Sequence, residues 1–293
     1  MKYKAMKQFF YLVFLTLCTM PLMAEQQLKI MAWNIFMVPP VIFKSCQSER
    51  ALLIADYIKL MDADIVVLEE SFMKSTREVI NEKLNSIYPY QSSITKSGLL
   101  KTNSGIWILS KYPITKQDFI RYKKKKGSDV FARKGATFTE ILVDGKKVQI
   151  IGSHTQSLPK YKSTRALQFQ QLKTTMLDKY FTDSIPQLVV GDLNCNYYDT
   201  SEYNSMLQLL DVLPANFSGE KYSWNGLEND LAHTFSERTL ETLDYVLLRK
   251  RQESLAEIIS TEITKPYSDS CICNKNFHYL SDHHPVVAVV RLK

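Results

Sequence analysis

The stretch Q-L-V-V-G-D-L-N, residues 187–194, decides the fold of this chain. Its apolar residues predict a short buried strand, and Gly191 permits a sharp turn where that strand ends. Asp192 and Asn194 follow at the strand end, and alternation along an extended segment sends both side chains to the same side. A carboxylate and an amide oxygen can therefore converge on one phosphate or metal ion. An ordinary strand that ends in a polar turn has the same local pattern, so the other strand ends must decide between the two interpretations.

Three further predicted strands end in residues of the same chemical kind. They are residues 28–33, which end at Asn34, residues 64–68, which end at Glu69 and Glu70, and residues 147–153, which end at His154. Between the first two strands, apolar residues at helical spacing predict a helix over residues 49–60. Strand, helix and strand with polar residues at the strand ends indicate an α/β fold whose site lies on one rim of the sheet.

The rest of the chain continues the same alternation of strands and helices. Further helices are predicted over 74–86, 165–180 and 202–210, and further strands over 104–114, 136–143, 243–248 and 285–292. The turn Asp144-Gly145 joins the strands 136–143 and 147–153 as a hairpin. Neither a repeat nor a low-complexity linker interrupts residues 25–293, so we expect one domain.

The N-terminal residues are typical of a secretory signal. Lys2, Lys4 and Lys7 precede an apolar run over residues 9–20, and Ala24 supplies a small residue for cleavage. We expect residues 1–24 to be removed near Ala24 and the protein to be secreted. An uncleaved N-terminal anchor is the alternative, but the apolar run is short for a membrane span.

A formal net charge of +7 favours anionic partners, which include nucleic acid, membrane surfaces and phosphorylated substrates. The basic run over residues 121–126 suits either a solvated turn or a contact with anionic lipid or phosphate. Cys46, Cys195, Cys271 and Cys273 remain after removal of the signal. The C-x-C spacing does not suit a structural zinc site, and a disulfide from Cys46 to either Cys271 or Cys273 stays open.

Eight polar residues at predicted strand ends form one candidate site. They are Asn34, Glu70, His154, Asp192, Asn194, Asp244, Asp282 and His283. Oxygen ligands without a cysteine suit a hard ion such as Mg²⁺, with Mn²⁺ as a substitute. Two histidines among carboxylates can supply a general base and a hydrogen-bond donor to a negatively charged oxygen.

The order of the motifs resembles the endonuclease/exonuclease/phosphatase superfamily of metal-dependent phosphoesterases. The series is A-W-N (32–34), V-V-L-E-E (66–70), G-I-W-I-L-S-K-Y-P-I (105–114), G-S-H (152–154), G-D-L-N (191–194), L-D-Y (243–245) and S-D-H-H-P-V (281–286). The resemblance implies a four-layered α/β sandwich, in which two mixed β-sheets pack face to face and are flanked by helices.

Within this superfamily the chain is most similar to secreted bacterial neutral sphingomyelinases. The likeness rests on Q-S-E-R-A (47–51), I-L-S-K-Y-P-I (108–114), D-V-F-A-R-K-G-A-T-F-T-E-I (129–141) and G-S-H-T-Q-S (152–157). The chain departs from the pattern where Glu69 replaces a glutamine and Thr155 replaces a leucine. The resemblance implies a secreted Mg²⁺-dependent phosphodiesterase that hydrolyses sphingomyelin to ceramide and phosphocholine.

The resemblance also implies a role for each residue. Glu70 and Asn34 would hold the principal Mg²⁺, while Asp192, Asn194 and Asp282 would line the phosphate and nucleophile side, with or without a second ion. His283, oriented by Asp244, would be the general base that activates water for in-line attack. His154 would donate to a phosphoryl oxygen, and Lys134 would contact the phosphate or the lipid headgroup.

Two other functions remain open from the residues. A secreted deoxyribonuclease-like endonuclease would use the same catalytic set, but it would want a broad basic face. A host-binding protein with a degenerate site would have little reason to keep the eight polar residues. Phe277 and Tyr279, in a segment polar enough to be a loop, favour a lipid substrate if their rings hold choline or enter the membrane interface. We expect a monomer that acts on sphingomyelin in a membrane surface without a stable protein partner.

Overall fold

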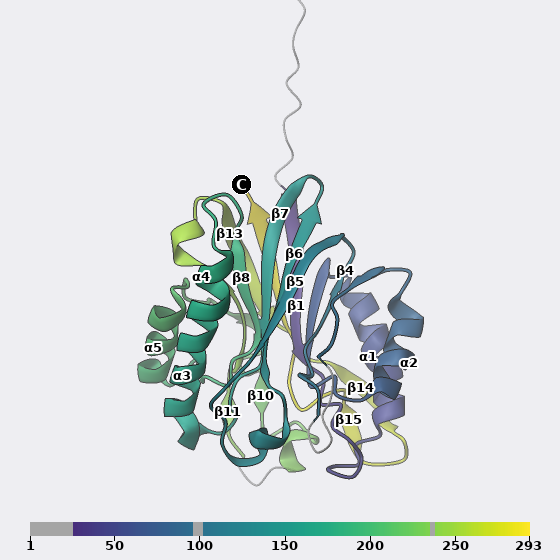
Figure 1. Cartoon of the computed structure of the whole chain (residues 1–293). Helices are drawn as coiled ribbons and strands as arrows, with labels where there is room; N and C mark the ends of the chain where they lie inside the picture. The colour runs from purple at the N-terminus through teal and green to yellow at the C-terminus, as the bar shows by residue number, and fades with distance from the viewer. Residues whose placement is uncertain (1–25, 96–101, 235–237) are drawn as a thin grey trace, which may run out of the picture.

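Two β-sheets form the centre of the computed structural model, which describes residues 26–95, 102–234 and 238–293 (Figure 1). The signal peptide expected over residues 1–24 lies outside the described residues. Helices cover the outer face of each sheet, on the right and on the left of the view. The structure therefore confirms the expected four-layered α/β sandwich.

The larger sheet has seven strands. In spatial order they are β3 (Tyr90–Gln91), β4 (Trp107–Ser110), β2 (Ile65–Glu69), β1 (Gln26–Asn34), β16 (Val286–Leu292), β13 (Ala256–Ile263) and β9 (Ser218–Gly219). β1 pairs in parallel with β2 and antiparallel with β16, so the sheet is mixed. The helices α1 (Gln47–Met61) and α2 (Lys74–Leu84) cover its outer face.

The second sheet has five strands, and it is also mixed. In spatial order they are β12 (Asp244–Leu248), β8 (Gln187–Asp192), β7 (Lys146–Ser153), β6 (Gly135–Val143) and β5 (Ile114–Arg121). Its outer face is covered by α3 (Lys162–Leu172), a π-helical turn (Lys173–Leu177), α4 (Asp178–Tyr180) and α5 (Thr200–Leu210). The helix expected over residues 165–180 is therefore a helical run with a π-helical turn inside it.

Three apolar clusters fill the spaces between the four layers. Branched side chains of both sheets, such as Ile30, Val67, Ile150 and Val190, meet in the middle cluster. The other two clusters lie under the outer helices. Strands buried on both faces read as continuous apolar runs, which is why residues 188–190 show no polar alternation. Burial at about 25 cal/mol per Å² of apolar surface makes these clusters the main source of stability.

Two small hairpins and several short 3₁₀ helices complete the described chain. β10 (Trp224–Asn225) pairs with β11 (Leu240–Glu241), and β14 (Tyr267–Ile272) pairs with β15 (Phe277–Tyr279). The 3₁₀ helices are η1 (Gly127–Phe131), η2 (Pro159–Tyr161), η4 (Ala232–Thr234) and η5 (Lys250–Gln252). Within the described residues, no helix has both the length and the apolar character needed to cross a membrane.

The structure corrects two expectations from the sequence. The segment around Phe277 and Tyr279 is not a loop, because residues 267–279 form the β14–β15 hairpin. A disulfide joins Cys46, at the start of α1, to Cys273 in the turn of this hairpin, which settles the pairing that the sequence left open. Cys271 and Cys195 are free thiols. The strand expected over residues 104–114 is shorter than expected, and a separate strand, β5, begins after Pro113.

Candidate active site

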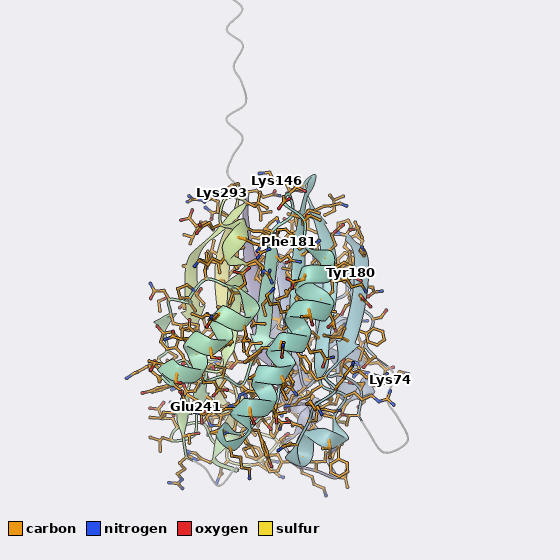
Figure 2. The ribbon with its side chains drawn as sticks, turned by 60° about the vertical axis from the view of Figure 1, so that its left-hand side comes forward. Lys74, Lys146, Tyr180, Phe181, Glu241 and Lys293 are labelled. Atoms are coloured by element: carbon orange, nitrogen blue, oxygen red, sulfur yellow. A yellow bond between two sulfur atoms is a disulfide. The ribbon has the colours of Figure 1, made fainter. Side chains whose placement is uncertain are left out.

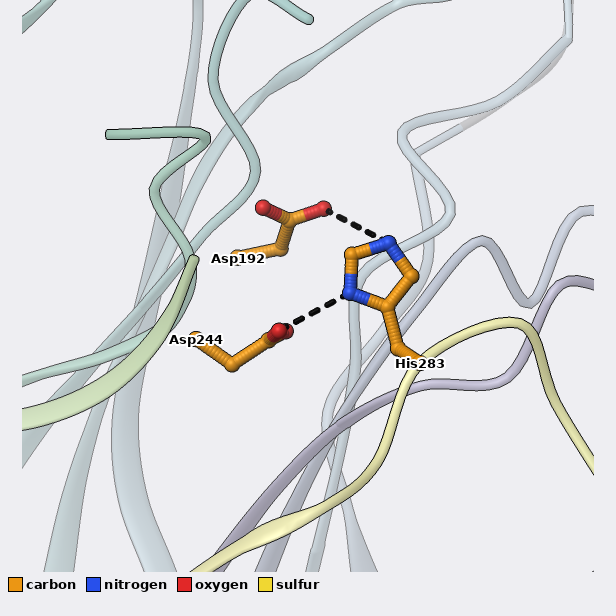
Figure 3. A group of neighbouring side chains, drawn as sticks. All are labelled: Asp192, Asp244 and His283. Atoms are coloured by element: carbon orange, nitrogen blue, oxygen red, sulfur yellow. Dashed lines mark hydrogen bonds and ion pairs between the residues drawn. The ribbon is translucent and has the colours of Figure 1, made fainter. Parts of the chain in front are cut away.

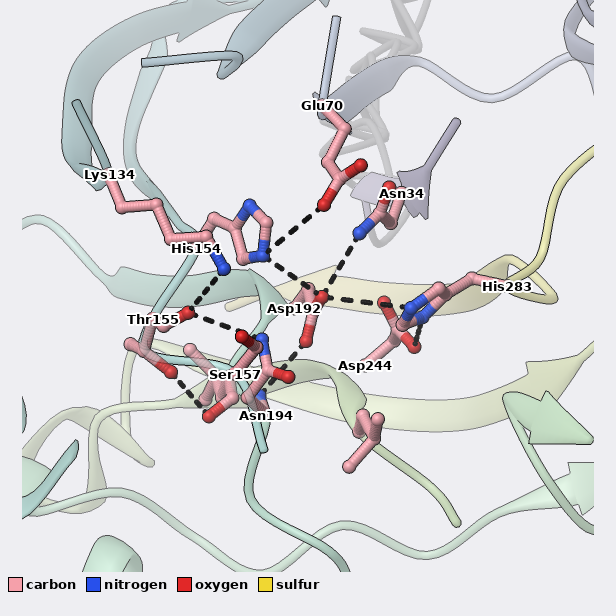
Figure 4. Close-up of polar contacts among 12 residues, drawn as sticks. Asn34, Glu70, Lys134, His154, Thr155, Ser157, Asp192, Asn194, Asp244 and His283 are labelled. Atoms are coloured by element: carbon pink, nitrogen blue, oxygen red, sulfur yellow. Dashed lines mark hydrogen bonds and ion pairs between the residues drawn. The ribbon is translucent and has the colours of Figure 1, made fainter. Parts of the chain in front are cut away.

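Strand ends from both sheets meet at one end of the sandwich, which lies at the bottom of Figure 1. β1 and β2 are parallel, so Asn34 at the end of β1 lies at the same edge as Glu70, which follows β2. β7 and β8 are parallel as well, which places His154 beside Asp192. Asp244 begins β12 and is the register partner of Asp192. The two sheets thus bring their polar ends together across the sandwich (Figure 4).

Two of these residues have an unusual backbone conformation. Glu70 has a φ of 53° and Asn194 a φ of 47°, both in the left-handed region. Residues other than glycine rarely adopt this conformation, and it persists where the surrounding structure holds it. The carbonyl of Glu70 accepts hydrogen bonds from the amides of Met37 and Phe72, which fixes the turn after β2. The fold therefore holds the Glu70 and Asn194 side chains in defined directions.

Asp192 lies at the centre of the site (Figure 4). Its Oδ2 accepts a hydrogen bond from Asn34 Nδ2 at 3.1 Å and lies 3.3 Å from His154 Nε2. Its Oδ1 accepts a hydrogen bond from the amide of Asn194 at 2.9 Å. His154 Nε2 also lies 4.0 Å from Glu70 Oε1. One buried carboxylate thus holds residues from three different strand ends in a single network.

His283 and Asp244 form a buried pair on the other side of Asp192 (Figure 3). Nδ1 of His283 lies 2.8 Å from Oδ2 of Asp244, and Nε2 lies 3.9 Å from Oδ2 of Asp192. Because Nδ1 is engaged with Asp244, Nε2 is the nitrogen that can exchange a proton with a substrate or a water. Trp224 packs edge-on against the His283 ring at 5.1 Å between ring centroids. The imidazole is therefore held from two sides.

The two histidines have opposite electrostatic environments. Burial, together with the positive charge of Lys134, lowers the pKa of His154 well below its ordinary value, which favours the neutral ring. Burial alone would lower the pKa of His283, but the carboxylates of Asp244 and Asp192 outweigh it and hold that pKa well above its ordinary value. His154 is thus suited to donate one hydrogen bond, and His283 to carry a proton.

The carboxyl groups of the site share a concentrated negative charge. Burial and the neighbouring Asp244 carboxylate raise the pKa of Asp192 to about 6. Burial, with Glu70 nearby, raises the pKa of Asp282 to about 7 against the opposing charge of His283, and burial also raises the pKa of Glu70. Each raised pKa shows that the ionised form lacks enough positive charge around it.

This donor set fits a divalent cation. The oxygens of Glu70, Asn34 and Asp192 are hard ligands of the kind that Mg²⁺ prefers. A divalent cation among them would supply the positive charge that the buried carboxylates lack. Ligand atoms of Asp192, Asp244 and His283 lie within 4.8 Å of one another as well. A cation at this second group would compete with the hydrogen bond between Asp244 and His283, so the oxygen ligands around Glu70 suit it better.

Arg50 is a residue of the site region to which the sequence analysis assigned no role. Its guanidinium is fully buried and donates to the carbonyls of Ile35, Phe36 and Leu280. It thus ties the loop after Asn34 to the segment before Asp282. Burial lowers the pKa of Arg50 to about 10, while Asp282 and Glu70 oppose that shift. An arginine on the apolar face of α1, in the motif Q-S-E-R-A, was the signal that could have identified it.

Glu69 ends a predicted strand and departs from the family pattern, but the sequence indicated no role for it. It is fully buried, and neither of its carboxyl oxygens has a hydrogen-bond partner among the described residues. Burial, followed by the Asp244 and Asp192 carboxylates, raises the pKa of Glu69 well above its ordinary value. The residue lies against Gly191, where a Cβ would come within 2.4 Å of Glu69 Oε1. Gly191 therefore provides the space that Glu69 occupies.

Lys134 is buried at the edge of the site, and its charge is already matched. Its Nζ lies 3.2 Å from Asp129 Oδ1 and donates to the carbonyl of Thr155 at 3.0 Å. Thr155 donates in turn to the carbonyl of Leu193. The lysine thus links the turn before β6 to the strand ends that carry His154 and Asn194.

The structure places Phe277 and Tyr279 away from this network. Tyr279 is only 4% exposed and stacks on His284, so its ring is not presented to solvent as the sequence analysis expected. Phe277 is half-buried and packs edge-on against Phe43. Pairing in the β14–β15 hairpin turns both side chains toward the protein, and a reading of the segment as a loop could not reveal that.

Comparisons with known proteins agree with the motif order. The model of the Endonuclease/Exonuclease/phosphatase family matches residues 31–283. Sphingomyelinase C from Listeria ivanovii is 29% identical over 285 residues, which cover 88% of this chain and 85% of that protein.

Solved structures show the same likeness. The crystal structure of Sphingomyelinase C from Streptomyces griseocarneus has a TM-score of 0.82 at 26% identity and covers 92% of this chain and 100% of that one. A mutant of beta toxin from Staphylococcus aureus with bound magnesium ions has a TM-score of 0.81 at 26% identity, covering 90% and 99% of the two chains. These findings confirm the resemblance to bacterial sphingomyelinases and the expectation of a phosphoric diester hydrolase. The chain belongs to the Endonuclease/Exonuclease/phosphatase family.

Proposed function

We propose that the protein is a secreted, Mg²⁺-dependent phosphodiesterase that hydrolyses sphingomyelin to ceramide and phosphocholine. The observation that carries this proposal is the buried pair of His283 and Asp244 beside Asp192, at a strand end shared with Glu70. Similarity to sphingomyelinases over most of the chain supports the choice of substrate. The proposal assigns each residue a role that its contacts allow.

His283 is the proposed general base. Its Nε2 accepts a proton from the attacking water, while Asp244 holds Nδ1 and stabilises the imidazolium that forms. The water oxygen bonds to phosphorus, the bond from phosphorus to the ceramide oxygen breaks, and the ceramide alkoxide takes up a proton. Asp192, 3.9 Å from Nε2, is placed to orient the water from the other side.

Neutral and amide donors surround the proposed phosphate position. His154, kept neutral by burial, donates a hydrogen bond from Nε2 to a phosphoryl oxygen. Asn194 and Asp282 line the nucleophile side in this proposal, and Lys134 contributes positive charge at the edge. A neutral donor suits this role because it does not form an ion pair with the carboxylates around it.

Glu70 and Asn34 are the proposed ligands of Mg²⁺, with Mn²⁺ as a substitute. When bound, the ion supplies positive charge to the phosphoryl and leaving oxygens. Positive charge held there would also oppose the effect of Asp192, one of the carboxylates that raise the pKa of His283, while Asp244 stays paired with Nδ1. The ion would thus favour the form of His283 whose Nε2 can accept a proton.

Secretion is supported by two features. The basic and apolar character of residues 1–24 is typical of a signal peptide. The disulfide between Cys46 and Cys273 fits a protein that folds in an oxidising compartment. We propose that the mature protein begins near residue 25 and acts outside the cell as a single domain.

A membrane surface as the location of the substrate is supported by exposed apolar side chains at the site end of the sandwich. Val41 is 92% exposed, Ile42 67% and Phe131 64%. The first two follow β1 and the third ends η1, and both segments lie at the lower end of Figure 1. Lys123, Lys124 and Lys126, just before η1, are exposed as well. Apolar residues beside basic ones are typical of proteins that enter a lipid interface.

The proposal is tested by phosphocholine release from sphingomyelin vesicles, measured beside nicking of plasmid DNA with the same preparation. We expect phosphocholine to be released in a Mg²⁺-dependent manner and the plasmid to stay intact. We expect this because the exposed Lys123, Lys124 and Lys126 lie in the segment that leads to the exposed Phe131, a combination that suits a lipid interface. Rapid nicking without phosphocholine release would favour the endonuclease and refute the proposal.

We expect the double substitution of Ile42→Ser with Phe131→Ser to weaken binding to sphingomyelin vesicles roughly tenfold or more, because burying such a side chain contributes about 1.5–3 kcal/mol. Sedimentation with vesicles in chelator measures binding without hydrolysis. Leu60→Ser on α1, at a side chain that is 73% exposed, is the matched control. Hydrolysis of a soluble phosphocholine ester should not change. A comparable loss on the soluble ester would show that the two residues act through the fold.

A further inference from the structure

A cavity beside the candidate active site contains a carboxylate without an assigned role. The cavity has a volume of about 320 Å³, near the lower end of the range for small-molecule sites. Asn194, which belongs to the active-site network, lines it, as do the start of α3 and the segment that contains Glu241. Figure 2 shows Glu241 at the lower end of the molecule, which is the end where the candidate active site lies. Lys146 and Lys293 lie at the opposite end.

The charges of this cavity are paired with one exception. Lys162 forms an ion pair with Asp199. Arg165 holds Glu202 with two contacts of 2.6 and 3.0 Å. Glu241 lines the same cavity, and no ion pair within the described parts of the chain involves it. The cavity therefore has one unmatched negative charge, which suits a cationic ligand.

The backbone links Glu241 directly to the proposed base. Glu241 is the register partner of Trp224 in the β10–β11 hairpin. Trp224 also forms an antiparallel bridge with His283, so the three residues lie side by side on adjacent segments. The next residue, Thr242, donates a hydrogen bond from its amide to Oδ1 of Asn196, which also lines the cavity. Trp224 thus lies between Glu241 on one side and His283 on the other.

We propose that this cavity is the subsite for the quaternary ammonium end of the substrate headgroup, with Glu241 as its counter-charge. The inference rests on the proposed function and deepens it. In phosphocholine a two-carbon chain separates the cation from the phosphate, so the cation must lie beside a residue of the phosphate site, as the cavity does through Asn194. A quaternary ammonium has no hydrogen to donate, and carboxylates and aromatic rings are the groups that attract it.

The test compares two soluble diesters, 4-nitrophenyl phosphocholine and bis(4-nitrophenyl) phosphate, which lacks a cation. For Glu241→Gln we expect a KM for the choline ester that is roughly tenfold higher at low ionic strength, with kcat little changed. Glu241→Lys should raise this KM further, and added salt should reduce both effects because it screens exposed charges. Kinetics on the diester without a cation should not change with Glu241→Gln. Glu82→Gln, at an exposed carboxylate on α2, is the matched control.

Calorimetric titration with phosphocholine and with inorganic phosphate gives a readout that does not depend on turnover. We expect Glu241→Gln to weaken phosphocholine binding and to leave phosphate binding unchanged. Equal KM changes on both diesters, or equal phosphocholine affinity in the wild type and Glu241→Gln, would refute the subsite. If the wild type cleaves neither ester but its phosphocholine affinity depends on Glu241, the proposed function fails and the subsite stands.

Discussion

Replacing His283 with alanine is expected to lower kcat roughly 10²- to 10⁴-fold, the usual contribution of a general base. Nε2 of His283 is the only nitrogen of that ring left to accept the proton, since Nδ1 is engaged with Asp244. The measurement is single-turnover phosphocholine release, with circular dichroism as the check on the fold. His278→Ala, at a half-buried histidine of the β15 strand, is the control for loss of an imidazole elsewhere.

Asp244→Asn should reduce kcat in the same direction, because an amide cannot stabilise the imidazolium of His283. Combined with His283→Ala, it should add little, since the two residues act as one unit. The opposite result is a double-mutant cycle in which the losses of kcat from the two single substitutions simply multiply. That result would show that the 2.8 Å contact between His283 and Asp244 does not contribute to catalysis. A large loss of structure in either variant would instead point to the buried hydrogen bond as a structural element.

Chelation of divalent cations should reduce activity by roughly 10³-fold or more, because metal stabilisation of a phosphoryl transition state is worth several kcal/mol. Addition of Mg²⁺ or Mn²⁺ should restore it. Glu70→Ala should raise the Mg²⁺ concentration required as well as slow turnover, while Glu82→Gln should alter neither. Full activity in excess chelator would show that the buried carboxylates do not serve a metal.

A thermal-shift titration tests the same site without turnover. The pKa values of Asp192 and Asp282, about 6 and about 7, lie above the ordinary 3.8. At these two groups the folded state therefore binds more protons than the unfolded state, and their contribution to stability falls as the pH rises from about 4 to about 7. A bound cation offsets this loss once the carboxylates are ionised. We expect Mg²⁺ to raise Tm more at pH 8 than at pH 5, and Glu70→Ala to diminish the gain.

The sequence predicted the elements whose signal is local. Residues 187–194 form β8 and its polar end because a buried apolar run followed by glycine has few other structures. β1 pairs in parallel with β2, and β7 pairs in parallel with β8, so the polar strand ends lie at one end of the sandwich. Asn34 and Asp192 are therefore in contact there. The order of motifs supplied the architecture, which local patterns alone could not.

Other features could not be predicted from the sequence, because they depend on residues that pair over long distances along the chain. The segment 267–279 is polar on average, and only the pairing of β14 with β15 and the disulfide to Cys46 define its structure. The burial of Tyr279 follows from this pairing, which the residues alone do not reveal. Glu241 has no distinctive motif of its own, and the roles of Glu241 and Arg50 depend on a cavity and on a network of carbonyls that exist only after the fold is complete.

The place of β16 in the larger sheet has a consequence for how the enzyme is made. β16 lies between β1 and β13, so without it the sheet divides into two unconnected halves. β1 must therefore wait for a strand far along the chain before its second edge is paired, and such distant pairing slows folding. His283 lies three residues before β16, so the same insertion brings it to Asp244. An unfinished or unfolded chain thus lacks the assembled His283–Asp244 pair, and under the proposed function a producing cell would not meet an active enzyme before the sheet has closed.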